Sequence, residues 1–307
     1  MNSKIRMLLN LAILPGALFL TGCTTNSATG RLQFNGMSRN EEIALGTQAM
    51  PQMIEEYGGK VNDQALQDYV TEIGTKLSQY TEGNNPSLPW EYTLLDSDQI
   101  NAFALPGGKI FITRGLMSKM TNEAQLAGVL GHETGHVTAQ HTDDRIARAE
   151  IVSIGASIAG AVTKDSNSTW AQYAPVIIGA GGQGYLLHFS RGQESEADTL
   201  GMRYMTRAGY NPEGQYQVME ILKEAAAESG GGGIEMLSTH PLPETRMHDI
   251  RNIIDTDYHY TKNNPEYGFY ENEFQTRALS RLATPPHQQQ DNRNRGKRRK
   301  QSRSLKK

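Results

Sequence analysis

The chain has 307 residues, of which 37% are hydrophobic and 21% charged, enough for one large folded body or two modest ones. This composition excludes a chain that is disordered throughout, and the single cysteine, Cys23, excludes an internal disulfide and a cysteine-rich metal cluster. The formal charge of −3 conceals an asymmetry: residues 285–307 carry nine Lys or Arg against one Asp, whereas residues 1–284 carry 21 Lys or Arg against 32 Asp or Glu. We expect residues 38–284 to fold and residues 285–307 to form a disordered basic tail.

The N-terminus has the layout of an export signal. Two basic residues precede an apolar run, residues 7–20, which is too short to span a bilayer comfortably, as in a secretory signal peptide. The run leads into Leu-Thr-Gly-Cys23, which resembles the bacterial lipobox, whose cysteine is acylated. We predict a signal peptide over 1–22, lipidation of Cys23 and a polar tether over 23–37. A free buried thiol after an ordinary signal peptide is the alternative. The resemblance, with Thr24 next, implies an outer-membrane anchor facing the periplasm.

The segment after the tether contains helical and strand patterns. Ser38 and Glu41 fit a capping box, which marks the start of a helix. Further runs predict a helix over 64–80, a strand over 90–95 and two strands over 102–105 and 109–113. A Pro-Gly-Gly turn separates the last two runs and predicts a β-hairpin. Nearly everything that follows has a helical pattern, so the predicted fold class is α+β, mainly helical.

Residues 151–187 contain two apolar pieces separated by a polar stretch. Each piece is shorter than the ~17 residues that a transmembrane helix needs, and both are rich in small residues. We expect a buried or membrane-leaning helical hairpin here. The functional alternative is a flexible gate over an active-site cleft.

Residues 132–136 read His-Glu-Thr-Gly-His. Histidines four residues apart on a helix lie about 40° apart on one face, so His132 and His136 can share a zinc ion. Glu133 would then face a zinc-activated water as general base. A catalytic zinc takes three protein ligands and a water, so a third ligand must come from another part of the chain.

The helix that carries this motif is predicted to begin near Thr121 or Asn122. Three glycines lie within it, at Gly128, Gly131 and Gly135. Each costs about 1 kcal/mol relative to Ala inside a helix, so their presence indicates close packing of a neighbour or a functional requirement.

The motif has other interpretations. Two helix histidines without a metal are one alternative, and Glu133 with His136 also fits the Glu-x-x-His element of di-iron bundles. A second copy of that element is absent from the sequence, which disfavours iron. The metzincin extension fails at Ala139 and Thr142. The third ligand is therefore not on this helix turn, and His141 is expected to be a surface histidine at the helix end.

Three carboxylates lie close together at the start of a later predicted helix. Glu194 and Glu196 are about 200° apart around a helix, so only one of them can face the histidine pair. Asp198 shares the face of Glu194, where it can accept the outer N–H of a zinc-bound histidine. We predict that Glu194 is the third ligand, that Asp198 orients a ligand, and that Glu196 is a surface or ion-pair residue.

The His-Glu-x-x-His motif followed by Ser-Arg-x-x-Glu-x-x-Ala-Asp resembles the zinc metallopeptidase family of HtpX, the type I CAAX prenyl proteases and BepA. Blocks at 101–108, 114–116 and 238–246 are similar to family motifs, and the likeness covers roughly residues 38–255. It is closest to periplasmic BepA-like or lipoprotein members that lack the C-terminal helical repeats. The resemblance implies a zincin-like (gluzincin) domain with one Zn²⁺ per chain and a small sheet beside the active-site helix.

The resemblance also assigns roles to further residues. It implies that the strand containing Ala102, Phe103 and Ala104 holds an extended substrate by main-chain hydrogen bonds. It places His240 near the metal, where it would stabilise the oxyanion or occupy the position of the water in a latent state. A structural histidine beside Pro241 is the alternative.

The predicted function is a lipid-anchored periplasmic zinc metalloendopeptidase that cleaves unfolded or misassembled envelope proteins. The alternative is a non-catalytic chaperone or assembly factor for outer-membrane proteins. We expect no nucleic-acid partner, because charge runs such as 285–307 usually are solvated arms. An anionic envelope polymer or lipid is the candidate partner of this tail.

Overall fold

The computed structural model describes most of the domain predicted from the sequence. The described residues are 23–34, 36–147, 189–229, 234–241 and 244–282. The predicted signal peptide, the apolar segment 151–187 and the basic tail therefore lie outside the described residues. Within the described residues, none of the helices is both long and apolar enough to cross a membrane.

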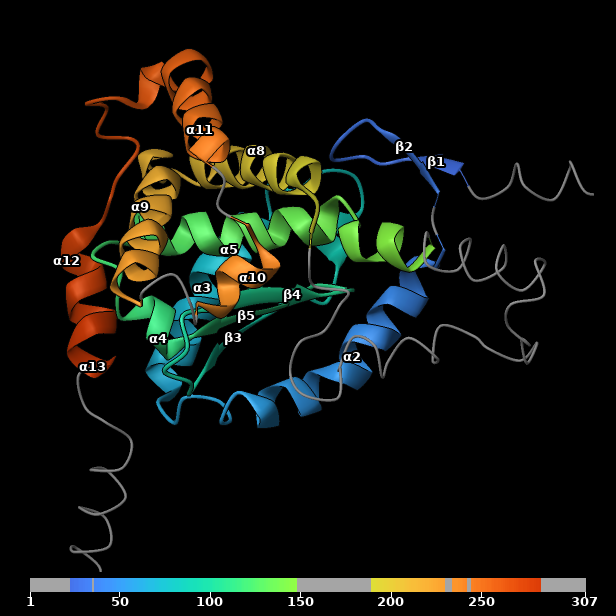
Figure 1. Cartoon of the computed structure of the whole chain (residues 1–307), viewed down its shortest axis with the longest axis horizontal. Coiled ribbons are helices and arrows are strands. Elements are labelled where there is room, and N and C mark those ends of the chain that lie inside the picture. Colours follow the sequence, from blue (N-terminus) through green and yellow to red (C-terminus); the bar gives the residue numbers. More distant parts are fainter. Residues whose placement is uncertain (1–22, 35, 148–188, 230–233, 242–243, 283–307) are drawn as a thin grey trace, which may run out of the picture.

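Helices surround a small sheet, which confirms the mainly helical α+β class (Figure 1). In chain order the elements are β1 (Cys23–Thr25), β2 (Leu32–Phe34), α2 (Arg39–Glu56), α3 (Gln64–Ser78), β3 (Glu91–Leu95), β4 (Ala102–Leu105), β5 (Lys109–Thr113), α4 (Arg114–Met117), α5 (Glu123–Thr138), α8 (Arg191–Arg207), α9 (Glu213–Glu228), α10 (Glu235–Thr239), α11 (Glu244–Asp257), α12 (Glu271–Phe274) and α13 (Ser280–Leu282). Short 3-10 or π turns lie at 85–87, 259–261 and 275–279.

Local sequence signals fix where several helices begin. The capping box predicted before α2 is present: Ser38 Oγ accepts the backbone N–H of Glu41, and the Glu41 carboxylate accepts the Ser38 N–H at 2.7 Å. Asn122 caps α5 by accepting the N–H of Gln125 at 3.0 Å, which confirms the predicted start of the motif helix. These side chains satisfy N–H groups that have no partner within the first helical turn.

The sheet has the strand order β3-β5-β4. β4 and β5 pair antiparallel with Phe103 opposite Phe111, which confirms the predicted hairpin. In the turn between them Gly107 and Gly108 have φ values of +72° and +88°, which glycine adopts without strain. β3 pairs parallel with β5 on the other side, so β4 is an edge strand of this sheet.

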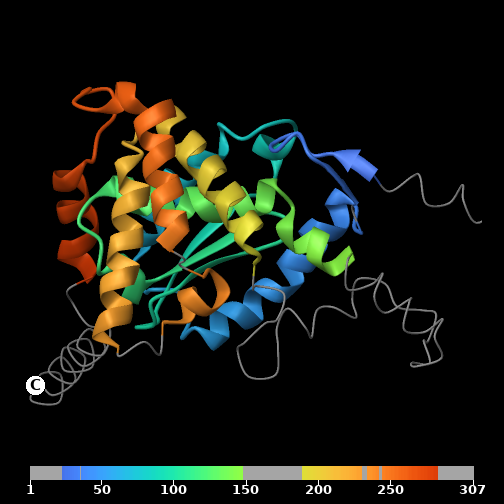
Figure 2. The same ribbon diagram turned by 45° about the horizontal axis from the view of Figure 1, so that its top comes forward.

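The two faces of the sheet pack against different helices. Phe103, Leu105 and Phe111 join the apolar side chains of α2, whereas Ala104 and Ile110 join those of α3 and α5. This division follows from the alternation of side chains along a strand. Figures 1 and 2 show α5 between the sheet on one side and α8 on the other, so α5 is the central, fully buried helix.

α5 and α8 approach closely because glycines face each other at their contact. A Cβ on Gly201 would lie 2.8 Å from the backbone N of His132, and one on Gly131 would lie 3.1 Å from the carbonyl oxygen of Gly201. Gly135 packs equally closely on Ala197. The glycines expected to permit close packing therefore do so, and they bring the carboxylates of α8 to the histidines of α5.

The segment predicted to be a polar tether contains a packed hairpin. β1 and β2 pair antiparallel, and the side chain of Asn26 donates to the carbonyl of Thr138 at 2.9 Å. Arg203 of α8 donates to the Ala28 carbonyl at 3.2 Å. Thr138 is the last residue of α5, where carbonyls have no partner within the helix, so the polar hairpin satisfies a group that would otherwise need water. We call residues 23–34 the N-terminal hairpin.

Candidate metal centre

The two motif histidines converge from one face of α5. Their Nε2 atoms are 3.0 Å apart, and their rings are nearly perpendicular at 81°. Both side chains are almost completely buried, because the sheet, α8 and the segment around His240 enclose this face of the helix.

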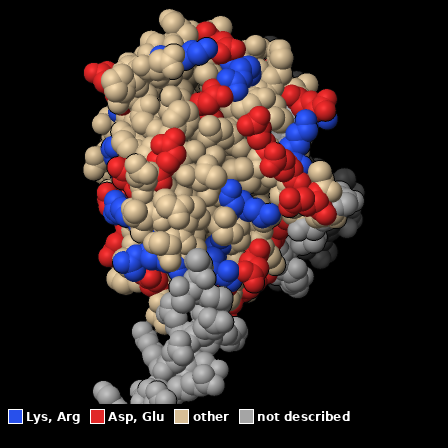
Figure 3. Space-filling model, turned by 90° about the vertical axis from the view of Figure 1, so that its left-hand side faces the viewer, with Lys and Arg blue, Asp and Glu red and all other residues tan. Residues whose placement is uncertain are grey.

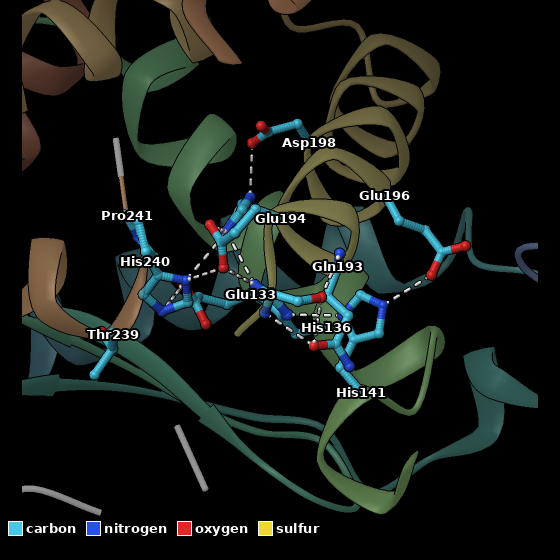
Figure 4. Close-up of polar contacts among 12 residues, drawn as sticks. Glu133, His136, His141, Gln193, Glu194, Glu196, Asp198, Thr239, His240 and Pro241 are labelled. Carbon is cyan, nitrogen blue, oxygen red and sulfur yellow. Dashed lines mark hydrogen bonds and ion pairs between the residues drawn. The ribbon is translucent and has the colours of Figure 1, made fainter. Parts of the chain in front are cut away.

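Helix α8 brings Glu194 to the histidine pair. Ser190 opens this helix with a second capping box, in which Gln193 is the reciprocal partner. The Glu194 carboxylate lies 3.5 Å from His132 Nε2 and 3.4 Å from His136 Nε2. Figure 4 shows Glu196 directed away from this cluster, as expected for two residues on opposite sides of a helix.

His240 joins the cluster from the end of α10. Its Nδ1 lies 2.9 Å from a Glu194 oxygen and 3.4 Å from His132 Nε2. The four side chains each offer a ligand atom, and these atoms lie within 4.8 Å of one another. Imidazole nitrogens and a carboxylate oxygen are typical zinc ligands. The donor set of His132, His136, Glu194 and His240 therefore fits zinc.

Glu133 is buried beside the cluster. Neither of its oxygens has a hydrogen-bond partner within the described part of the chain, and His240 Nε2 lies 3.7 Å from its Oε1. Burial raises the pKa of Glu133. A buried carboxylate that protein groups leave unbound is available to accept a proton from a water or substrate group.

Behind the cluster, Asp198 orients His132. One of its oxygens is 2.9 Å from His132 Nδ1, so the outer nitrogen of the ring is held while Nε2 faces the cluster. The placement is the one expected from its position four residues after Glu194. The amide of Gln215, on α9, donates to the same oxygen at 3.0 Å.

Arg246 is a site residue to which the sequence analysis assigned no role. Its guanidinium lies 2.6 Å and 2.9 Å from the two oxygens of Asp198 and 2.6 Å from Glu194 Oε2. It also donates to the carbonyl of Pro241 at 3.1 Å, which ties down the chain next to His240. The only signal available was its place in the family-like block 238–246. No spacing rule connects one arginine at the start of a polar helix with carboxylates almost fifty residues earlier.

The expectation of a surface position for His141 is wrong. The side chain is completely buried, with Nδ1 2.8 Å from His136 Nδ1 and Nε2 2.8 Å from Glu196 Oε2. On a continuous helix a residue five positions after His136 would point about 140° away from it. Gln140 instead has φ +56°, so the chain turns after α5 and returns His141 to His136.

Charges around the cluster favour a cation at its centre. Burial opposes protonation of His132, but Asp198 and Glu194 outweigh it and raise the pKa of this histidine to about 9. Burial lowers the pKa of His136, which keeps its ring neutral and able to donate a lone pair. Glu194, among the converging ligand atoms, and Asp198, at the outer nitrogen of His132, thus both stabilise positive charge in the cluster.

The predicted substrate strand lies beside this centre. Ala104 and Leu105 of β4 line a hollow together with His136 and Val137 of α5. Phe189 stacks on the ring of His136, with ring centroids 3.9 Å apart, and covers it from the α8 side. The strand, the motif helix and the cluster are therefore contiguous.

Comparisons with known proteins agree with this geometry. The model of peptidase family M48 matches residues 64–254. The chain is 33% identical over 198 residues to the beta-barrel assembly-enhancing protease of Escherichia coli K12, covering 62% of this chain and 39% of that protein. It is 29% identical over 237 residues to the mitochondrial metalloendopeptidase OMA1 of Schizosaccharomyces pombe, covering 76% of this chain and 67% of that one. The chain thus spans about two fifths of the length of the bacterial relative.

These findings confirm the family resemblance drawn from the motifs. The match includes both α5 and α8, which supply three of the four ligand atoms. Because it covers more than half of the chain, the chain belongs to peptidase family M48 and is a zinc-dependent metallopeptidase.

Proposed function

We propose that this metallopeptidase is a lipid-anchored periplasmic endopeptidase that cleaves unfolded or misassembled envelope proteins. The observation that carries the catalytic part is the Glu133 carboxylate, which has no hydrogen-bond partner among the described residues and is buried next to four converging ligand side chains. A site built only to hold a metal for stability would have no use for a buried carboxylate without a hydrogen-bond partner.

Each residue of the site has a separate role in hydrolysis. His132, His136 and Glu194 would hold a zinc ion, which would supply the positive charge that activates water and polarises the scissile carbonyl. Glu133 accepts the proton of the attacking water and passes it to the leaving amine. Asp198 keeps the outer nitrogen of His132 bound, so that Nε2 stays directed into the site.

His240 has two roles compatible with its position. Its Nε2 has no hydrogen-bond partner within the described residues and lies near Glu133, where it can stabilise a developing oxyanion. Its Nδ1, beside Glu194, is placed to complete the ligand set when no substrate is bound. The second arrangement corresponds to a latent state.

The position of β4 supports extended segments as substrates. An edge strand next to the catalytic helix can bind a peptide by adding it as a further strand, which places main-chain groups in register with the site. Such pairing requires an unpaired, extended segment of the substrate. Unfolded proteins and loops supply such segments, and a native domain has few. Relatives named beta-barrel assembly-enhancing protease support envelope proteins in assembly as the substrate class.

The location rests on the lipobox-like residues that end at Cys23. Cys23 is also the first residue of β1. Mass spectrometry of the N-terminal peptide from membrane-extracted protein should show diacylglyceryl and acyl groups on Cys23. An unmodified cysteine would refute the anchor while leaving the peptidase activity unaffected.

The tail 285–307 is proposed to dock on anionic lipid head groups or envelope polymers. On the face of the folded domain shown in Figure 3, acidic and basic side chains are interspersed, so this face offers no continuous basic area for nucleic acid. Removing residues 285–307 should weaken salt-sensitive association with anionic vesicles and leave peptide hydrolysis intact. Equal vesicle binding with and without the tail would contradict this role.

The decisive assay separates the peptidase from a holding chaperone. Zinc-loaded protein should cleave an unfolded protein such as reduced, alkylated casein, and Glu133→Gln should bind zinc but not cleave it. A chaperone would suppress aggregation of an unfolded protein equally well with Gln at position 133. Absence of cleavage by the zinc-loaded parent, together with undiminished holding by Glu133→Gln, would favour the chaperone.

A further inference from the structure

A series of buried and partly buried polar contacts leads from His136 to the N-terminal hairpin. His136 Nδ1 lies 2.8 Å from His141 Nδ1, and His141 Nε2 lies 2.8 Å from Glu196 Oε2. Arg31, in the loop between β1 and β2, donates to the same Glu196 oxygen at 3.0 Å. These residues come from three segments that are far apart in the sequence, and Figure 4 shows the inner part of this series.

Binding of a metal at His136 Nε2 fixes the direction of the hydrogen bonds from His136 to His141 and from His141 to Glu196. A neutral imidazole carries one proton, so a ring that gives the Nε2 lone pair to a metal has its proton on Nδ1. That N–H donates to His141 Nδ1, which must therefore be the unprotonated nitrogen. The proton of His141 is then on Nε2, where it donates to Glu196.

Glu196 and Arg31 form the outer end of this series of contacts. The Glu196 side chain is 24% exposed and that of Arg31 39% exposed, so the series reaches solvent at these two residues. The hairpin that carries Arg31 is docked independently by Asn26 on the end of α5 and by Arg203 on the Ala28 carbonyl. Arg31 is consequently held at a fixed distance from α8.

We propose that His141, Glu196 and Arg31 position His136 for metal binding and make the N-terminal hairpin part of the metal centre. His132 and His136 then each have an outer partner: Asp198 for the first and His141 for the second. Outer partners of ligating histidines fix the tautomer and ring orientation, and their loss typically weakens metal binding. The inference concerns metal binding alone and does not depend on which proteins are cleaved.

The test is the zinc dissociation constant of the full chain, measured by competition with a fluorescent chelator. His141→Ala should weaken zinc binding about 10- to 100-fold. His141→Asn places an amide near the former Nδ1, so it keeps an acceptor for His136, loses the link to Glu196 and should weaken binding less than His141→Ala. Arg31→Ala should weaken binding at most about five-fold, the scale of a partly exposed ion pair.

Two control variants separate this role from general effects. His248→Ala removes an exposed histidine of α11 and should leave the zinc affinity unchanged. Arg203→Ala removes another contact between α8 and the hairpin but none of the contacts among His136, His141, Glu196 and Arg31. If the role is specific to Arg31, Arg31→Ala must weaken zinc binding more than Arg203→Ala does. If His141→Ala does not fold, as judged by circular dichroism, His141→Asn and Arg31→Ala decide the question.

A spectroscopic measurement reads the tautomer directly. In ¹⁵N-histidine-labelled, zinc-loaded protein, long-range ¹H–¹⁵N correlations should show His136 protonated on Nδ1 and His141 protonated on Nε2. A proton on Nδ1 of His141 would overturn the proposal, and so would zinc affinity within two-fold of the parent in every His141 variant that folds.

Discussion

Replacing Arg246 by Met should strongly destabilise the metal-free protein. The Arg246 side chain is 3% exposed, and its guanidinium neutralises two buried carboxylates, Asp198 and Glu194. Although burial acts to raise it, Arg246 holds the pKa of Asp198 below its ordinary value. Methionine fills a similar volume without charge, so the change isolates the loss of the guanidinium from the loss of packing.

The expected magnitude follows from the burial of this network. Removing one partner of a buried ion pair costs roughly 3–5 kcal/mol, because water does not replace the lost counter-charge. Both carboxylates lose Arg246 here, but His132, whose pKa is raised to about 9, stays beside them as a cation at pH 7, which places the expectation at the lower part of that range. Arg281→Met is the matched control: Arg281 pairs with Asp63 at 3.1 Å, but its side chain is 46% exposed. Such pairs contribute about 0.2–1 kcal/mol.

The assay is urea unfolding at pH 7 in the presence of a chelator, with the free energy of unfolding compared among parent, Arg246→Met and Arg281→Met. Adding Asp198→Asn to Arg246→Met should recover part of the loss, since a neutral amide needs no counter-charge. Equal losses of less than about 1 kcal/mol in both arginine variants would refute the reasoning, because the carboxylates would then be shown not to depend on the guanidinium.

Three further predictions concern the site and its surroundings. Glu133→Gln should retain one zinc per chain while cleavage of unfolded protein falls by about 10² or more, as for loss of a general base, whereas His136→Ala should lose both. Glu194→Ala should lose zinc in metal analysis of folded protein, and Asp198→Ala should weaken zinc binding about 10- to 100-fold; full zinc in Glu194→Ala would mean that the ligand set is wrong. Burial, with nearby Glu42, raises the pKa of Asp143 to about 7. The folded state therefore holds a proton that the unfolded state releases, and the free energy of unfolding should fall as pH rises from about 4 to 7. Asp143→Asn should reduce this fall when urea unfolding is measured across the pH range. An unchanged dependence on pH would contradict the raised pKa of Asp143.

Much of the fold and part of the site could be predicted from sequence because the signals are local. Capping residues act within one helical turn, so Ser38 and Asn122 mark their helices wherever these pack. The four-residue spacing of His132 and His136 sets their common face, and the spacing of Glu194 and Asp198 does the same on a second helix. The hairpin of β4 and β5 depends on a three-residue turn. Each of these features is determined by neighbours in the chain.

Only the tertiary structure decided which distant groups meet. The position of Arg246 beside Asp198 and Glu194 depends on where α11 docks on α8, and one arginine carries no periodic signal. The burial of His141 depends on the left-handed conformation of Gln140, whereas the sequence predicted a surface histidine at the helix end. The N-terminal hairpin packs on α5 because it satisfies a carbonyl at the helix end, a need that exists only once the helix is buried. The sequence shows which side chains are able to bind a metal ion or to pair with a charged group. The packing of helices and loops determines which of these side chains come into contact.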